Sequence, residues 1–169
     1  SKGDIRASLL TGLQQLWVRT GVPITLSDQE KTAFLNQFTA QNDPPLRHAA
    51  LQLLRVVGLP QQADRFIKTQ ALPVITNQQA NEDFRSDAIY LLSLATPMLK
   101  TDLVQTLVKP KEPLTVQFAA LQTMSQVTDN EPCVYLFNNW KELNSAVQDK
   151  AIDAMIKREK WSHLLLDAV

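Results

Sequence analysis

The chain has 169 residues with 17 basic and 17 acidic side chains, so its formal net charge is zero. This balance lacks the basic excess by which proteins attract nucleic acid or anionic lipid, and a single cysteine, Cys133, excludes both an internal disulfide and a cysteine-based metal cage. Hydrophobic residues make up 44% of the chain, enough to build a core, yet no apolar run approaches the roughly 18 residues of a membrane span.

Helices are predicted along the whole chain, separated by short linkers that contain Pro or Gly. Residues 4–19 form the first predicted helix, which belongs to an incomplete first unit. Ser27 and Glu30 have the spacing of a capping box, in which the two side chains satisfy free N–H groups at the start of a second helix. Further helices are expected at about 46–57, 61–71, 83–95, 98–108, 114–127, 131–143 and 145–158, with a last one starting near 161.

The helix boundaries are predicted from the same residue types. Asn42 or Asp43 suits the N-cap of the third helix, because proline is tolerated in the first turn that follows. The segment 73–81 is predicted to be a linker, and Ser145 with Gln148 offers a second capping box. Since no alternating pattern is long enough to indicate a sheet, the predicted fold class is all-α.

One short pattern recurs four times along these helices. It consists of an aliphatic or aromatic residue, Arg or Gln, two free positions, Ala, a second aliphatic residue, two free positions, and Leu or Met. The central alanines lie 38, 32 and 31 residues apart (88−50, 120−88, 151−120), a spacing typical of a helical solenoid. The pattern predicts a right-handed, HEAT-like or armadillo-like superhelix of about four helix pairs, forming a single domain over residues 1–169. These alanines are Ala50, Ala88, Ala120 and Ala151.

The pattern also predicts how the helices pack. An alanine at the centre of the inner helix lets a neighbouring helix approach closely, whereas a larger side chain would overpack the contact. Arg47 and Arg85 follow Asp43 and Asp83 within one turn, so each Arg is expected to pair with the carboxylate at the start of its own helix.

Isolated reactive side chains are predicted to have no catalytic or metal-binding role: the histidines and carboxylates are expected at the surface or its boundary, and the tryptophans are expected to pack between units. The two histidines are far apart in the sequence, and neither is accompanied by the further ligands that a metal site needs. Cys133 is predicted to be a buried, small apolar residue. No catalytic triad, phosphate-binding glycine loop or nucleophile elbow is present, so no catalytic, cofactor-binding or metal-binding residue is assigned. The residues weighed in this way are His48, His163, Cys133, Trp17, Trp140, Trp161, Glu142, Asp149 and Asp153.

A candidate partner-binding face follows from the repeat itself. Positions two before and two after each repeat alanine project from one edge of the inner helix. Stacked units would align these positions as a strip, on which Tyr90 and Phe118 are the expected contact anchors. The full set is His48, Gln52, Ser86, Tyr90, Phe118, Gln122, Asp149 and Asp153. A merely solvated face with scattered aromatic residues is the alternative interpretation.

Five segments of the chain are similar to one family of helical-repeat domains. They are Leu9-Leu10-x-Gly12-Leu13, Phe84-Arg85-x-x-Ala88-Ile89-x-Leu91-Leu92, Pro110-Lys111-Glu112-Pro113-Leu114-x-Val116-Gln117-x-Ala119-Ala120-Leu121, Trp140-x-x-Leu143 and Trp161-x-x-Leu164-Leu165-x-Asp167-Ala168-Val169. The third is the most specific. Together they resemble the HEAT-like domain of large bacterial haem-binding, membrane-bound-dehydrogenase-type proteins described from planctomycetes and relatives in Bacteroidetes.

In that family, a propeller related to sugar dehydrogenases precedes the helical domain and a cytochrome c domain follows it. The resemblance therefore implies that this chain is a non-catalytic spacer or docking domain of an exported, periplasmic bacterial redox protein. The haem-binding Cys-x-x-Cys-His of the family has no counterpart here, because Val134 and Tyr135 follow Cys133. Haem is expected only in a separate domain of the parent protein. The apolar run that reaches Val169 is taken as a sign of a fragment.

Two other functions stay open at this stage. One is a stand-alone adaptor that binds a peptide or protein in its groove. The other is an enzyme that resembles the HEAT-like alkylpurine DNA glycosylases, which would need a basic groove with a placed carboxylate rather than a balanced charge. The expected partners are other domains of the same polypeptide or a separate protein. Nucleic acid, a small-molecule substrate and membrane insertion are not expected.

Overall fold

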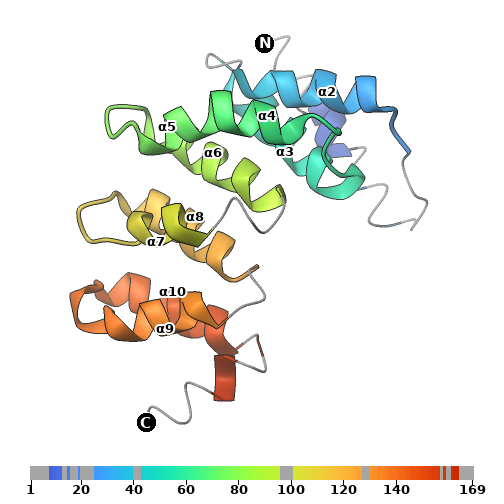
Figure 1. Ribbon diagram of the computed structural model, residues 1–169. Coiled ribbons are helices and arrows are strands. Elements are labelled where there is room, and N and C mark those ends of the chain that lie inside the picture. The colour runs from blue at the N-terminus through green and yellow to red at the C-terminus, as the bar shows by residue number, and fades with distance from the viewer. Residues whose placement is uncertain are drawn as a thin grey trace. The chain divides into compact units, whose positions relative to one another are not determined.

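The computed structural model describes residues 8–12, 15, 19, 25–39, 43–95, 101–126, 130–156, 158 and 161–163. All secondary structure within these ranges is helical, which confirms the all-α prediction for the described part of the chain (Figure 1). Most of the first predicted helix, including Trp17, lies outside the described residues. None of the described helices has the length and apolar character needed to cross a bilayer. The chain divides into two compact units, Ser1–Ala95 and Thr96–Val169.

The first unit is built around two helices, α3 and α6. Helix α3 packs against α2 and against α6, and α6 packs in turn on α5. The elements of this unit, in chain order, are α2 (Asp28–Asn36) with a 3₁₀ turn (Gln37–Thr39), α3 (Pro44–Val57), α4 (Ala63–Phe66), a π-helical turn (Ile67–Ala71), α5 (Leu72–Thr76) and α6 (Glu82–Leu94).

Local hydrogen bonds explain where α2 begins and where α3 begins, and a glycine marks where α3 ends. The predicted capping box is confirmed, since the Ser27 N–H donates to Glu30 Oε2 at 2.8 Å and the Glu30 N–H donates to Ser27 Oγ at 3.3 Å. Asp43 is the N-cap of α3, because its Oδ1 accepts the N–H of Leu46 at 3.1 Å. Gly58 ends α3 with a φ of 81°, a conformation that residues with a Cβ rarely adopt.

The predicted linker at 73–81 is wrong over its first four residues. The helical path runs without a break from α4 through the π-helical turn and α5 to Thr76. Pro73 is tolerated here because it lies in the first turn of α5, directly after the wider π-helical turn. That turn changes the hydrogen-bond register where a regular α-helix would meet both the missing N–H and the ring of a proline.

The second unit repeats the same kind of packing around α8. This helix packs against α7 and against α10, and α7 also contacts α9. Its elements are α7 (Thr101–Leu107), α8 (Leu114–Met124), α9 (Glu131–Asn138), a 3₁₀ turn (Trp140–Glu142) and α10 (Ser145–Ile156). The predicted capping box of Ser145 is wrong by one residue: the Val147 N–H donates to Asn144 Oδ1 at 2.9 Å.

The four repeat alanines lie on the buried faces of α3, α6, α8 and α10. Each has no exposed surface, and they are Ala50, Ala88, Ala120 and Ala151. Because α3 packs on α6 and α8 packs on α10, these small side chains sit in helices whose axes come close together. The repeated pattern therefore marks the helices that form the core of each unit.

The second position of the pattern ties three of these helices to the segment that precedes them. Arg85 donates from Nε and Nη2 to the carbonyl of Ile75, at 3.1 and 3.0 Å. Gln117 Nε2 donates to the carbonyl of Glu112 at 2.6 Å. Gln148 Nε2 donates in the same way to the carbonyl of Trp140 at 2.8 Å. Each bond ties an inner helix to a backbone carbonyl of the preceding segment, and the Trp140 carbonyl also accepts the N–H of Leu143 at 3.2 Å.

Candidate partner-binding face

In the first unit, side chains predicted for the partner-binding face form a chain of hydrogen bonds between α3 and α6. Tyr90 of α6 donates its hydroxyl proton to Gln52 Oε1 at 3.1 Å. Gln52 Nε2 lies 3.4 Å from His48 Nε2, and His48 Nδ1 lies 3.3 Å from Asp87 Oδ1. With the ring proton on Nδ1, His48 donates to Asp87 and accepts from Gln52. The chain therefore fixes three predicted residues relative to one another.

Asp87 is the buried end of this chain. Its Oδ2 accepts a hydrogen bond from Arg47 Nε at 2.6 Å, and the Arg47 and Asp87 side chains are 2% and 11% exposed. The Arg47 guanidinium also lies over the Phe84 ring, 4.8 Å from its centroid. The predicted pairing of Arg47 with Asp43 is therefore wrong, because the Asp43 side chain serves as the N-cap of α3. The ion pair instead joins two neighbouring inner helices.

His48 remains accessible although it is bonded on both sides. Its side chain is 61% exposed. The hydrogen bond to Asp87 raises the pKa of the imidazole above its ordinary value of 6.5, against the smaller, opposite effect of burial. A proton on His48 would thus be stabilised by the Asp87 carboxylate, and the nearby positive charge of Arg47 offsets part of this effect.

Arg55 adjoins the same edge, a position that the repeat did not predict. It is exposed on α3. Burial raises the pKa of Tyr90, and the charge of Arg55 and its hydrogen bond to the Tyr90 side chain partly oppose that rise. No carboxylate of a described residue lies within 4.0 Å of the Arg55 guanidinium. The nearby carboxylate, Asp87, pairs instead with Arg47 and His48. Ser86, the fourth predicted residue of this unit, stays outside the chain, and its Oγ is buried without a partner among the described residues.

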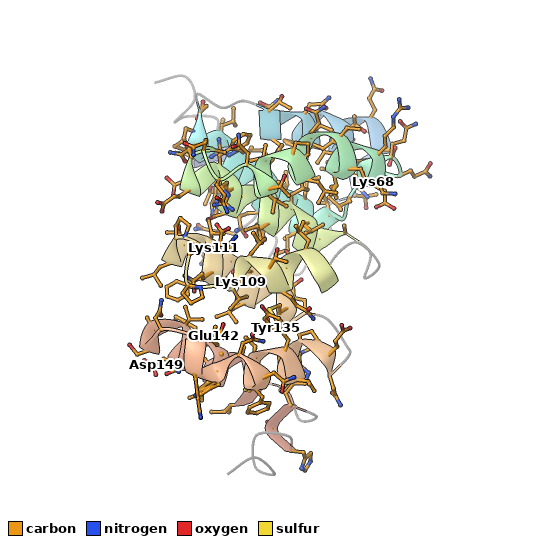
Figure 2. The ribbon with its side chains drawn as sticks, turned by 60° about the vertical axis from the view of Figure 1, so that its left-hand side comes forward. Lys68, Lys109, Lys111, Tyr135, Glu142 and Asp149 are labelled. Atoms are coloured by element: carbon orange, nitrogen blue, oxygen red, sulfur yellow. The ribbon has the colours of Figure 1, made fainter. Side chains whose placement is uncertain are left out.

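In the second unit, three of the four predicted residues line one groove. Phe118 and Gln122 of α8 face Asp153 of α10 across a groove of about 510 Å³. Phe118 is half-buried, whereas Gln122 and Asp153 are exposed. The remaining lining residues are Leu121, Ser125, Lys150, Ala154 and Arg158. Asp149 is exposed on α10 (Figure 2). It is not among the residues that line this groove.

The remaining candidate side chains lie outside both of these arrangements, and some are buried whereas others are exposed. Cys133 is fully buried, and this burial raises the pKa of its thiol, as predicted for a structural cysteine. Trp161 is buried with the Arg158 guanidinium 5.1 Å from its ring centroid, and Trp140 is half-buried. His163 and Glu142 are exposed, and Figure 2 shows Glu142 in the second unit. The described residues hold no group of three or more His, Cys, Asp or Glu arranged to bind a metal ion.

Comparison of the chain with protein-family models, with curated proteins and with solved structures gave no match.

Proposed function

We propose that the chain is a non-catalytic α-solenoid module that binds a protein partner along one edge of its inner helices. The observation that carries this proposal is the hydrogen-bonded chain from Asp87 through His48 and Gln52 to Tyr90. It holds exposed and half-exposed polar side chains in fixed positions on two helices.

The packing within each unit supports the helical-repeat part of the proposal. In the first unit, α3 packs on the preceding α2 and on the next inner helix, α6. In the second unit, α8 packs on the preceding α7 and on the next inner helix, α10. Repeat proteins are built from such pairs, in which each helix buries its apolar face against its nearest neighbours. The buried repeat alanines give the same register to all four inner helices.

The fixed positions of these side chains favour partner binding over a merely solvated face. A surface side chain that becomes fixed on binding costs about 0.5–1.5 kcal/mol in lost rotamer freedom. Gln52 and Tyr90 are already held by each other, so part of that cost is met before a partner arrives. Tyr90 and Phe118 are half-buried aromatic residues, the type most often found as anchors of protein interfaces.

The resemblance to haem-binding dehydrogenase-type proteins adds a proposed context. In it, the module positions a catalytic or electron-transfer domain of the same polypeptide and does not react itself. The natural coding sequence downstream of Val169 tests this context directly. A Cys-x-x-Cys-His within the next few hundred codons is expected, and a stop codon soon after Val169 would favour the stand-alone adaptor instead.

Site-specific photocrosslinking tests the partner-binding face. Benzoylphenylalanine replaces His48 or Gln122 on the face, and Gln70 or Lys141 serves as the matched exposed control in the same unit. In cells that encode the chain, discrete protein adducts are expected from the first pair and not from the controls.

The crosslinked polypeptide, once purified, provides the quantitative test. It should bind Tyr90→Ala or Phe118→Ala at least tenfold more weakly than the wild-type chain. Equal adducts from all four positions, or unchanged affinity of both alanine variants, would contradict the proposed face.

A further inference from the structure

We propose that the first unit's part of this face, the α3–α6 strip of His48, Gln52, Arg55 and Tyr90, binds an acidic segment of the partner. This inference rests on the proposed function and specifies the chemistry of its ligand.

The charges of the strip are positive and unbalanced. Arg55 is exposed, and no described carboxylate lies within ion-pair distance of it. Asp87 is the carboxylate that touches the strip, and it is largely buried and already bonded to Arg47. An incoming carboxylate would therefore find one cation, Arg55, that has no carboxylate partner among the described residues, and a second cation when His48 is protonated. Charge complementarity of this kind selects acidic ligands and speeds their association.

The length of the strip suits a short extended peptide. His48, Gln52 and Arg55 are spaced i, i+4 and i+7 on α3, so they share one face of the helix. At 1.5 Å per residue, seven residues of helix span about 10 Å. An extended peptide covers this distance with about three residues. Two carboxylates in such a segment can lie near Arg55 and His48 at the same time.

Protonation of His48 would change the direction of the hydrogen bonds. The protonated imidazole donates from both nitrogens, so Gln52 must turn its amide to offer Oε1 to His48 Nε2. The Gln52 amino group then donates to the Tyr90 oxygen, which releases the Tyr90 hydroxyl proton toward solvent. The strip would gain one positive charge and one outward donor, both of which favour a carboxylate ligand. The charged groups that act on His48 are Asp87 of α6 and Arg47 of α3 itself.

Two of the other grooves combine a cation with an exposed carboxylate. The groove of the second unit contains Lys150 and Arg158 but also Asp153. A groove of about 550 Å³ beside Arg47 contains Asp83, an exposed carboxylate, and Arg47 is already paired. An acidic ligand would meet a like charge in either groove, so the α3–α6 strip is the favoured site.

Fluorescence anisotropy with fluorescein-labelled hexaglutamate on the full chain tests the inference, at about 50 mM salt to limit screening. Arg55→Glu reverses the charge of the strip, and Arg55→Gln removes it. Arg65→Glu is the matched control, because Arg65 is an exposed arginine on α4 of the same unit. Labelled hexalysine reports non-specific binding, and circular dichroism reports folding of each variant.

Wild type and Arg65→Glu are expected to bind hexaglutamate within twofold of each other. Arg55→Gln should bind several-fold more weakly, and Arg55→Glu at least tenfold more weakly. Wild-type binding should strengthen as the pH falls through the raised pKa of His48, and His48→Asn should abolish that pH dependence. Equal loss in Arg55→Glu and Arg65→Glu, or no binding of hexaglutamate by the wild type, would overturn the inference.

The two proposals can fail separately. Benzoylphenylalanine at His48 could capture a partner whose binding hexaglutamate does not inhibit. In that case the face binds protein, but not through acidic groups. If hexaglutamate binds at Arg55 while no partner adduct forms at either position on the face, the site is confirmed as a carboxylate site and the proposed interaction function is contradicted.

Discussion

At the scale of single residues, Asp87 is a buried carboxylate that links α6 to α3. Its two carboxylate oxygens are bonded to different side chains of α3, Arg47 and His48. Removing one partner of a buried ion pair leaves the other charge uncompensated, at a cost of about 3–5 kcal/mol. Replacing both partners with apolar side chains removes that penalty.

We therefore expect Asp87→Ala to lower the free energy of unfolding by about 3–5 kcal/mol in urea denaturation. The double variant Arg47→Met/Asp87→Leu should recover most of this loss, because neither charge is then left unpaired in the core. A double variant that is less stable than Asp87→Ala would contradict this account of the pair.

The raised pKa of His48 predicts how the free energy of unfolding depends on pH. Its pKa is higher in the folded chain than its ordinary 6.5, so its contribution to stability is complete below about 6.5 and is lost as the pH rises through the folded pKa. The difference in unfolding free energy between wild type and His48→Asn should accordingly shrink as the pH rises above about 6.5 and through the raised pKa of the folded state. Urea titrations at several pH values measure it, and a difference that grows with pH would reverse the predicted sign.

The sequence predicted some of these residues but not their partners. His48, Gln52 and Tyr90 follow from helical geometry, because residues two positions from a buried alanine lie at the edge of its helix. Asp87 and Arg55 were missed, since the choice of partner for a long charged side chain depends on which helix packs beside it. The acidic residue directly before the repeat alanine Ala88 was the available signal for a contact with the neighbouring helix.

At the scale of elements, the packing of α8 sets the stability of the second unit. Leu121 follows a repeat alanine and is only 3% exposed on α8, the helix that packs against both α7 and α10. Leu121→Ala should cost about 2–5 kcal/mol, through lost burial and the cavity that it leaves. Leu114→Ala is the matched control on the same helix, because Leu114 is 45% exposed. Urea melts that give equal losses for both variants would contradict the assigned face.

Helix starts were more predictable than helix ends. The cap of α2 depends on Ser27 and Glu30, three residues apart, so the sequence alone contains it. The continuation of α4 into α5 depends on a π-helical turn, which no local residue pattern announces. Proline alone suggested a break, because the sequence does not reveal that the preceding turn is wide enough to accommodate it.

At the scale of the whole molecule, the division into two compact units predicts how a local defect spreads. In repeat proteins, stability is approximately a sum of the stability of each repeat and of the contacts with its nearest neighbours. Hydrogen exchange measured by mass spectrometry should show that Leu121→Ala accelerates exchange in α8 and α10 more than in α3 and α6. Asp87→Ala should produce the opposite distribution. Equal acceleration in both units would indicate one cooperative unit of folding.

The all-helical class and the four inner helices were accessible from the sequence, because the repeat alanines mark the buried faces. The single domain and the superhelical stack stay predictions. They depend on how the two units are arranged, which short-range patterns of apolar residues do not encode.

The Arg47–Asp87 pair also limits how the chain can be rearranged. The residues that directly precede the repeat alanines of α6, α8 and α10 are Asp87, Ala119 and Lys150. A duplication or exchange that brought α8 beside α3 would offer Arg47 no counter-charge at this position, and α10 would offer it a second cation. The neighbour of α3 is thus constrained by charge as well as by shape, because an exchange of α6 for α8 or α10 would leave Arg47 without its carboxylate partner.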